Sequence, residues 1–440
     1  MSAPSPALNP RVDAPVFDAS KPRSVVRING ASYLPKHWTV NRNGHGATDD
    51  ATFSLSLKMN PDFSRMLAQS GEKAFKPVPI SIWAGYPSNP LPGSTSIDGM
   101  VQRFLGNADI YEATPDADDV TFTCRSLAAP LVDQKLTSAP MNMTAQQFAQ
   151  AFATALGLKL NVVLAPGVTP ITIQEMLGRE YEGGSSFNAV VFNMHPWDIL
   201  LQCALFDDTD VWVDGNVLNY ASPSLIKRNR VVVPYGSLMR EPKLSHSLQL
   251  NRNIRVEVRS WSTKTRTAVA VRAEGNPNDG ITISQTSRTS TTSPIFGTPS
   301  VVSTSISPTG VASTISTTSG GVVNATTALG SEPTKQIYKI VDRHGLNLAN
   351  ANKLAQSLWR QYSAQEYAIE FSLRMTPSLL KTLSITSLFA VSGLPYALFN
   401  RTGMANEGYY PRTIVETFDS KEGWDLSVVA VNHVLPSGAV

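Results

Sequence analysis

Strict alternation of apolar and polar residues marks the first third of the chain and predicts β-strands. Apolar side chains occupy every second position over residues 53–59, 78–83 and 120–125. A period of two residues is typical of a strand with one buried face. Clusters of Gly, Pro, Asn and Asp separate these segments, as they do in antiparallel sandwiches and barrels. The first third is therefore predicted to be an antiparallel β-unit.

The pattern changes to a helical period near residue 136. Thr144 and Gln147 have the spacing of a capping box, which predicts a helix that starts there. Pro196 suits the first position of a second helix. The Asp-Gly pair at residues 214–215 lies between two apolar runs and predicts a tight hairpin. Residues 135–224 are therefore expected to form a small mixed α/β domain.

Strand patterns return in the last part of the chain. Residues 254–259 alternate, and residues 265–273 suit a second strand after a turn. Residues 348–362 place apolar side chains on one helical face, and residues 367–375 alternate again. Strand-like runs then continue to residue 431. This part is predicted to be a second β-unit that includes one packed helix.

A Ser/Thr-rich segment at residues 281–330 interrupts this second unit. It contains Gly and Pro and almost no charged residue. Such a composition does not bury enough apolar surface for a core of its own. We therefore expect a long loop, or strands that are completed by neighbouring subunits.

Composition describes an ordered protein with a weakly charged surface. Hydrophobic residues make up 42% of the chain and charged residues 16%, with a net charge of +3 and a pI near 8.7. A nucleic-acid binder would gather its basic residues in a stripe. The short basic run Lys227–Arg230 is interpreted as a solvated turn. No strongly charged partner is implied.

The remaining composition indicates a chain that is soluble as made. Residues 1–22 are rich in Pro, Ala and Ser and lack the apolar segment of a signal peptide. No apolar run reaches the length that crosses a membrane. Cys124 and Cys203 both lie within apolar patterns, so we expect two buried free thiols in a reducing compartment.

Several short segments resemble catalytic or binding motifs without completing them. Residues 182–186 are glycine-rich but lack the lysine of a phosphate-binding loop, and Ser185 and Ser186 have no nucleophile-elbow signature. Asp207–Asp210 resembles half of a cation-binding loop, but apolar residues follow where oxygen ligands are needed. A turn from helix to strand is the favoured interpretation there.

The histidines, glutamates and aromatic residues that remain as candidates do not form a metal-binding or catalytic pattern in the sequence. The six histidines have no metal-ligand spacing; they are His37, His45, His195, His246, His344 and His433. Glycosidase chemistry needs two facing carboxylates, and the spacing of Glu175, Glu180 and Glu182 does not single them out. Trp359, Arg360 and Tyr362 could suggest nucleic-acid stacking, but helical spacing favours a packed face. We therefore assign no catalytic, cofactor-binding or metal residue and expect no cofactor.

Five segments, taken together and in this order, resemble the late control D–type tail proteins of bacteriophages. The segments are Ile97–Val101, Cys124–Asp133, the helix Thr144–Leu158, the helix and hairpin Pro196–Leu218, and the helix Asn350–Gln361. No single one is specific, and their order and spacing carry the likeness. The Pro-rich arm is unmatched, and the 281–330 insertion is longer than the family pattern.

The resemblance implies a non-enzymatic baseplate hub with two tube-like β-barrels in one chain. Three copies would then form a pseudo-hexameric ring between a hexameric tail tube and a trimeric central spike. The related spike protein of type VI secretion fuses such a hub to an OB-fold and a β-helix. This chain ends at Val440 without room for either, so the spike is expected to be a separate polypeptide.

On this basis the fold is expected to be mainly β with α+β insertions, two tandem tube-like antiparallel β-barrels and a small mixed α/β domain. The expected parts are a Pro-rich arm (1–23), a first barrel (24–134), an α/β domain (135–240), a second barrel (241–434) with the 281–330 insertion, and a tail (435–440). The expected partners are two further copies, the tail tube protein, the central spike protein and other baseplate proteins, with the tape-measure protein as a further candidate.

The expected location is the virion tail baseplate, after synthesis and assembly in the host bacterial cytoplasm. DNA is expected only in passage through the lumen of the ring, and strand faces that carry Ser, Thr, Lys and Arg would suit a water-filled lumen.

Two alternatives for the function remain open. One is a tail-associated enzyme that degrades the cell wall with the Glu175–Glu182 segment near its site. The other is a siphophage distal-tail or fibre-attachment protein, which would form a ring of six copies instead of three.

Overall fold

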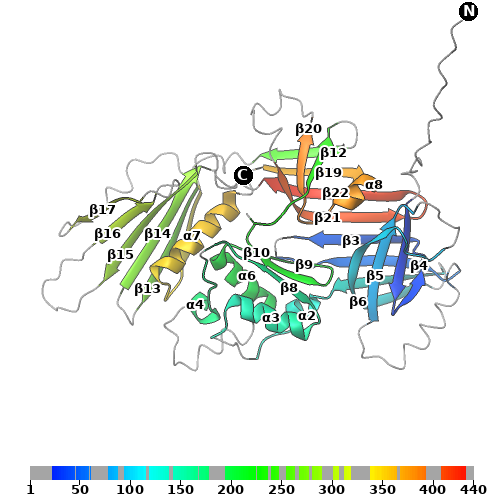
Figure 1. Ribbon diagram of the computed structural model, residues 1–440, viewed down its shortest axis with the longest axis horizontal. Coiled ribbons are helices and arrows are strands. Elements are labelled where there is room, and N and C mark those ends of the chain that lie inside the picture. Colours follow the sequence, from blue (N-terminus) through cyan, green and yellow to red (C-terminus); the bar gives the residue numbers. More distant parts are fainter. Residues whose placement is uncertain are drawn as a thin grey trace, which may run out of the picture.

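The chain folds into three sheets that lie side by side along its long axis (Figure 1). The computed structural model describes residues 22–44, 46–58, 60, 78–87, 94–114, 118–137, 142–166, 168–177, 194–223, 225–235, 239–246, 254–262, 267–276, 280–289, 301–306, 312–318, 337–363, 367–392 and 408–432. A mainly β protein with a small mixed α/β part is what the alternation pattern predicts, and this fold class is confirmed.

The large sheet contains 13 strands, of which all but β11 and β12 come from the first and the last third of the chain. Its hydrogen-bonded order is β12-β19-β22-β21-β3-β4-β7-β6-β5-β1-β2, with β20 beside β21 and β11 beside β20. The strands are β1 (Arg23–Ile28), β2 (Ala31–Tyr33), β3 (His37–Asn43), β4 (Asp50–Ser56), β5 (Val78–Gly85), β6 (Met100–Thr114), β7 (Asp119–Ser126), β11 (Arg230–Pro234), β12 (Met239–His246), β19 (Tyr367–Arg374), β20 (Leu388–Ser392), β21 (Tyr409–Asp419) and β22 (Gly423–Asn432). The short helix α8 (Pro377–Thr382) lies between β19 and β20 in sequence.

The pairing of β3 with β21 joins the two predicted β-units into one sheet. The two strands are antiparallel, and Val40 lies opposite Glu416. Alternate residues of both strands are buried, as the period of two requires. One apolar core therefore extends across strands from both ends of the chain.

The middle of the chain forms the predicted α/β unit. Its sheet has the order β8-β10-β9, and its elements are α2 (Ala129–Asp133), α3 (Ala145–Ala155), β8 (Lys159–Val163), α4 (Ile173–Leu177), α6 (Pro196–Asp207), β9 (Asp210–Asp214) and β10 (Val217–Ala221). The capping box is present, because Thr144 accepts a hydrogen bond from the Gln147 backbone and the Gln147 side chain accepts one from the Thr144 backbone. Pro196 starts α6, and Gly215 adopts a positive φ of 59° in the β9–β10 hairpin. All three local predictions are confirmed.

The third sheet corrects the prediction for the Ser/Thr-rich segment. Its order is β17-β16-β15-β14-β13-β18, with β13 (Ile254–Ser262), β14 (Thr267–Asn276), β15 (Gly280–Thr289), β16 (Val301–Ile306), β17 (Ala312–Thr318) and β18 (Ile337–Asp342). A long loop, or strands completed by neighbouring subunits, was expected over 281–330, yet β15, β16 and β17 extend the sheet antiparallel within the same chain. Backbone pairing with a preceding strand does not need apolar side chains, and Thr is a good strand former. The prediction from composition was therefore wrong for these residues.

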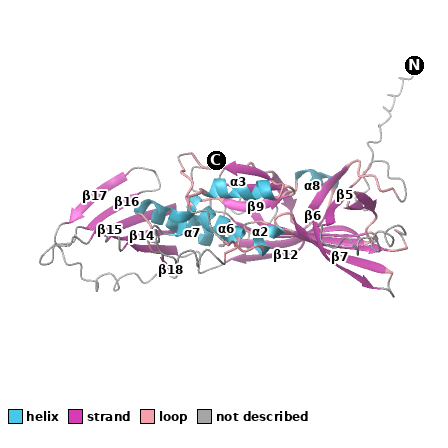
Figure 2. Ribbon diagram, turned by 90° about the horizontal axis from the view of Figure 1, so that it is seen from below, coloured by secondary structure: helices cyan, strands magenta, loops and turns pink. Residues whose placement is uncertain are grey.

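Helix α7 (Leu348–Ser363) ties the third sheet to the α/β unit. It lies across one face of the sheet (Figure 1). Its buried residues share a second core with β13, β14 and helices α3 and α6. None of the described helices lies on the opposite face of this sheet in either view (Figure 2). Among the described residues, no helix combines the length and apolar character that a membrane-spanning segment needs.

Candidate functional site: a polar sheet face and the ion cluster behind it

One face of the large sheet is polar across six adjacent strands, β19, β22, β21, β3, β4 and β7. The residues that alternate with the core on these strands are mostly Thr, Ser, Asn and paired charges, and we call this surface the polar face. Its centre consists of Thr39, Asn41, Thr52, Ser54, Thr121, Thr123, Thr417, Ser427 and Ser372. Thr121, Thr123 and Ser427 are exposed, and the other six are half-buried.

A row of threonines crosses four of these strands. Thr417 lies opposite Thr39, Thr39 lies opposite Thr52, and Thr52 lies opposite Thr123. Cross-strand threonine pairs stabilise a sheet and leave their hydroxyls free to bind water. The row therefore presents a hydrated and uncharged stripe perpendicular to the strands.

The charges around this stripe are largely paired with each other. Lys36 binds Asp119 at 2.5 Å, and Lys243 binds Glu370 at 3.2 Å. Protein affinity for nucleic acid comes mainly from cations that neutralise phosphates. A face with few unpaired cations offers little of that attraction, so a polyanion could pass over it without being held.

Three charged side chains lie buried behind the polar face, on the core side of the same sheet. They are Arg42 from β3, Arg103 from β6 and Glu416 from β21, and we call them the ion cluster. Arg103 donates from Nε to Glu416 Oε2 at 2.9 Å and also binds Oε1. Arg42 Nε lies 2.9 Å from Oε1 of Glu416. Both carboxylate oxygens are therefore occupied by guanidinium groups.

The ion cluster also joins the α/β unit to the large sheet. Arg42 donates to the backbone oxygen of Arg103 at 2.6 Å, and another of its nitrogens lies 3.9 Å from Asp214 at the end of β9. A hollow of about 250 Å³ lies beside these groups, and Asp49 contributes to its lining. One guanidinium thus contacts strands from three separate parts of the chain.

The electrostatics of Glu416 follow from this geometry. Complete burial by itself raises the pKa of Glu416, but the two guanidinium groups of Arg103 and Arg42 outweigh it and lower the pKa below its usual value. Burial and the neighbouring Arg42 lower the pKa of Arg103, which remains protonated because guanidinium groups do not titrate in the neutral range. Glu416 is therefore a fixed anion and not a proton donor.

The pKa of Asp49 is shifted in the opposite direction to that of Glu416. Burial raises its pKa to about 7, although the Asn43 backbone N–H, which donates to Oδ1 at 2.8 Å, and the charge of Arg42 oppose the increase. The nearby carboxylates of Asp214 and Asp50 add to the increase. Asp49 is thus the group near the cluster that titrates close to neutrality.

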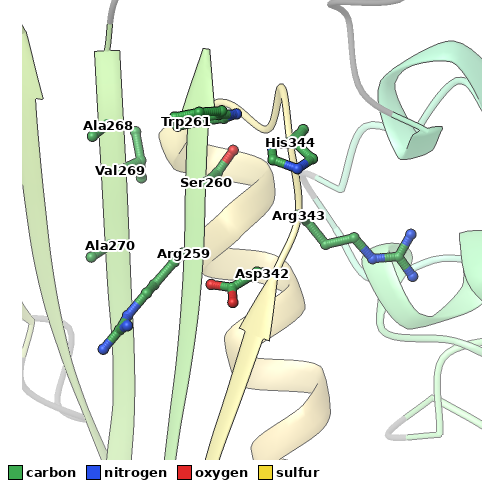
Figure 3. A pocket seen from close by; sticks show the side chains of 9 residues that line it. All are labelled: Arg259, Ser260, Trp261, Ala268, Val269, Ala270, Asp342, Arg343 and His344. Atoms are coloured by element: carbon green, nitrogen blue, oxygen red, sulfur yellow. The ribbon is translucent and has the colours of Figure 1, made fainter. Parts of the chain in front are cut away.

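A larger and more open hollow, of about 680 Å³, lies on the third sheet (Figure 3). Trp261 and His344 form one wall, with ring centroids 5.5 Å apart. Ala268 and Ala270 lie on the neighbouring strand, and Arg259 projects beside them. The described residues bring no three His, Cys, Asp or Glu side chains together as a metal site, here or elsewhere.

The acidic candidates from the sequence have structural roles. Asp207 accepts hydrogen bonds from the Ile171 backbone at 2.9 Å and from the Tyr220 hydroxyl at 2.8 Å. Asp208 forms an ion pair with Arg360 of α7. Helix α6 ends at Asp207 and strand β9 begins at Asp210, which confirms the predicted turn from helix to strand at 207–210. Glu175 accepts from the Thr172 backbone at 3.3 Å and so caps α4.

The remaining candidates divide into confirmed, corrected and undescribed ones. Cys124 and Cys203 are buried free thiols, and Trp359 is buried in the second core, as predicted. The basic run Lys227–Arg230 was interpreted as a solvated turn; Lys227, Asn229 and Arg230 are exposed, but Arg228 is half-buried and lies over the ring of Tyr410 at 4.3 Å. A guanidinium can pack flat on an aromatic face, which explains the difference. Glu180, Glu182, Ser185, Ser186, His45 and His433 lie outside the described residues.

The sequence analysis did not find the ion cluster, although a signal for it exists. On β21, Glu416 occupies the alternate position between the buried Ile414 and Phe418. On β3, Arg42 occupies the next alternate position after the buried Trp38 and Val40. A charged residue at a position reserved for the core predicts a buried partner of opposite charge. The identity of that partner requires the pairing of strands that are distant in sequence.

The comparisons with known proteins identify the fold. No protein-family model matches the sequence, and no curated protein matches it. The 43 kDa tail protein of prophage MuSo2 from Shewanella oneidensis aligns with 93% of this chain and 98% of its own, with a TM-score of 0.53 and 13% identity. A tail protein from Neisseria meningitidis MC58 aligns with 93% of this chain and 96% of its own, with a TM-score of 0.54 and 11% identity. The chain thus has the fold of these tail proteins, in agreement with the resemblance in its sequence.

Replacement of Glu416 should destabilise the whole sheet. In Glu416→Gln two buried guanidinium groups lose their anion, so we expect a loss of about 3–5 kcal/mol in the free energy of unfolding. Urea denaturation measures this loss. Glu370→Gln, on the exposed face of the same sheet, should change stability by less than about 1 kcal/mol. Equal effects of the two substitutions would contradict the structural role of the ion cluster.

Asp49 should make stability depend on pH between about 4 and 7. Its folded pKa is raised from 3.8 to about 7, so the folded state binds the proton more tightly and stability falls as pH rises through this window. Asp49→Asn keeps an acceptor for the Asn43 N–H and should remove this slope, measured as urea midpoints across the window. The matched control is Asp419→Asn, because backbone N–H groups, first that of Lys421, lower the pKa of Asp419 and confine its effect to more acidic pH. An unchanged slope in Asp49→Asn would refute the assignment.

Proposed function

We propose that this chain is a structural, non-enzymatic component of a bacteriophage tail, namely a baseplate hub that connects the tail tube to the central spike. The observation that carries the proposal is the shared fold with two tail proteins over nearly their entire length. Copies of the chain would form a ring, with a trimer as the expected state. Each copy would contribute two tube-like β-units to a ring that matches a hexameric tube.

The polar face supports this proposal by its chemistry. A surface that lines a DNA channel should be hydrated and should hold few unpaired cations, because unpaired cations bind phosphates. The threonine row and the paired charges around it meet both conditions. We propose that the polar face lines the lumen of the ring, and that DNA contacts it only during passage.

A cell-wall-degrading enzyme is the second candidate, and specific contacts disfavour it. Glu175, the described carboxylate of the segment considered for catalysis, caps α4 through Thr172. Glu416 is the most buried carboxylate described, but both of its oxygens bind guanidinium groups. A siphophage distal-tail protein is the third candidate and differs from the hub in forming a ring of six copies.

Imaging of intact tails without imposed symmetry tests the proposal directly. We expect three copies around the tail axis, between the tube and the spike. Six copies would assign the chain to the distal-tail class. A single peripheral copy would contradict the hub and require an assay for cell-wall hydrolysis.

Added cations on the polar face should slow DNA ejection. Thr39→Lys with Thr123→Lys introduces two exposed ammonium groups that can bind phosphates, so ejection should be slower and should recover when salt is raised. The rate is measured by DNA release from assembled particles. Gln146→Lys with Gln150→Lys adds the same charge on the exposed face of α3 and should leave the rate unchanged. Equal rates in both variants would contradict the lumen assignment.

A further inference from the structure

The turn between β3 and β4 fastens the large sheet to the α/β unit through one glycine. The backbone N–H of Gly46 donates to the oxygen of Val211 on β9 at 3.0 Å. The oxygen of Gly46 accepts a hydrogen bond from Nε1 of Trp197 on α6 at 2.6 Å. Gly46 has a φ of 90°, and a Cβ at this position would lie 2.7 Å from Cδ2 of Leu201. The close contact therefore favours a residue without a side chain, and we call this set of contacts the Gly46 joint.

The polar hollow of about 250 Å³ lies beside this joint. Its lining includes Asp49 at the end of the turn, Ser126 at the end of β7 and Asp214 at the end of β9. The oxygen of Asp49 accepts a hydrogen bond from the Ser126 N–H at 3.0 Å. Ser126 is buried, and its Oγ has no hydrogen-bond partner among the described residues. A polar hollow of this size has room for water, so the turn and the hairpin are not locked together by close packing here.

Asp49 is three residues from Gly46 and meets charges of both signs. The guanidinium of Arg42 attracts its carboxylate, whereas the carboxylates of Asp214 and Asp50 repel it. Glu416 already occupies Arg42, which limits how far this arginine can stabilise a second anion. The charged groups on the surrounding elements are Arg42 of β3, Asp50 of β4, Arg103 of β6, Arg125 of β7, Asp214 of β9 and Glu416 of β21.

Proton binding at Asp49 is therefore coupled to the state of the joint. With the joint closed, burial and the two neighbouring carboxylates raise the pKa of Asp49 from 3.8 to about 7. When the joint opens, the carboxyl group returns to water and its pKa falls toward 3.8. The closed state thus binds the proton more tightly. The opening constant consequently rises with pH between about 4 and 7 and is constant outside this window.

We infer that the Gly46 joint is a proton-controlled connection, which is closed while Asp49 is protonated and opens locally, away from β9 and α6, when Asp49 is ionised. Trp212 of β9 remains in the core of the large sheet, so opening loosens the attachment of the α/β unit and does not separate it. A local charge that biases a two-state element is a common form of conformational control. The inference concerns the connection between two parts of one chain and does not depend on the proposed function.

Hydrogen exchange of tryptophan indoles in the full chain, followed by NMR, measures the opening. The Trp197 indole N–H loses its bond to Gly46 when the joint opens, so its exchange reports this step. After division by the intrinsic exchange rate, its opening constant should rise by up to about tenfold per pH unit between about pH 5 and 7. The Trp38 indole N–H, bonded to Ser24 Oγ at 2.7 Å within the large sheet, is the internal control. Urea should accelerate Trp38 exchange strongly and Trp197 exchange weakly, because a local opening exposes little surface.

Three variants assign the effect to the hollow. Asp49→Asn carries no titrating proton, so its Trp197 opening constant should not change across this pH window. Asp214→Asn removes one repelling carboxylate, so the rise should end at a lower pH than in the wild type. A purely structural role of Asp214 would instead shift the opening constant equally at every pH. Asp198→Asn removes an exposed carboxylate next to Trp197 that does not line the hollow, and it should reproduce the wild-type profile.

Two results would overturn the inference. One is the same pH profile of Trp197 exchange in the wild type and in Asp49→Asn, because Asp49 would then not control the joint. The other is an equal urea dependence of Trp197 and Trp38 exchange, because the joint would then open only when the whole chain unfolds. Neither result bears on the hub, which imaging of intact tails tests separately.

Discussion

The buried contact of Glu416 with Arg103 and Arg42 is the constraint on which the large sheet depends. It joins β21 near the end of the chain to β3 and β6 near its beginning, and Arg42 reaches Asp214 of the α/β unit as well. A buried ion pair adds little net stability compared with apolar residues, but a broken one is costly. A register shift of one residue would bring Thr417 to the core and leave both guanidinium groups without an anion. The cluster therefore selects one register for strands that are about 370 residues apart in the sequence.

Local features of the sequence predicted local structure well, because each depends on residues that are close in the chain. The Thr144–Gln147 capping box, Pro196 at the start of α6 and the Asp-Gly hairpin at 214–215 all form as the residue types indicate. Alternation also identified β4 and β7 and their buried faces. It did not identify their neighbours, because the period of two specifies which side chains are buried and not which strand lies beside them. The joining of both β-units into one sheet follows from the β3–β21 pairing, which local patterns do not contain.

The Ser/Thr-rich segment and the ion cluster escaped prediction for different reasons. Composition was used as a measure of core formation, so a segment poor in apolar residues was expected to be a long loop, or strands completed by neighbouring subunits. Strands β15, β16 and β17 instead extend a sheet whose core is already supplied by β13, β14 and α7. The sequence analysis made no assignment for Glu416, which occupies a core position because Arg103 reaches it from another strand. For the ion cluster the missing information was a partner distant in sequence, whereas each of β15, β16 and β17 pairs with the strand before it.

The distribution of charge connects the fold to the proposed assembly. Buried charges are paired in the ion cluster, and the charges around the polar face are largely paired side by side. Paired charges attract a polyanion less than unpaired cations do. In the proposed hub, the polar face would therefore offer passing DNA little electrostatic attraction.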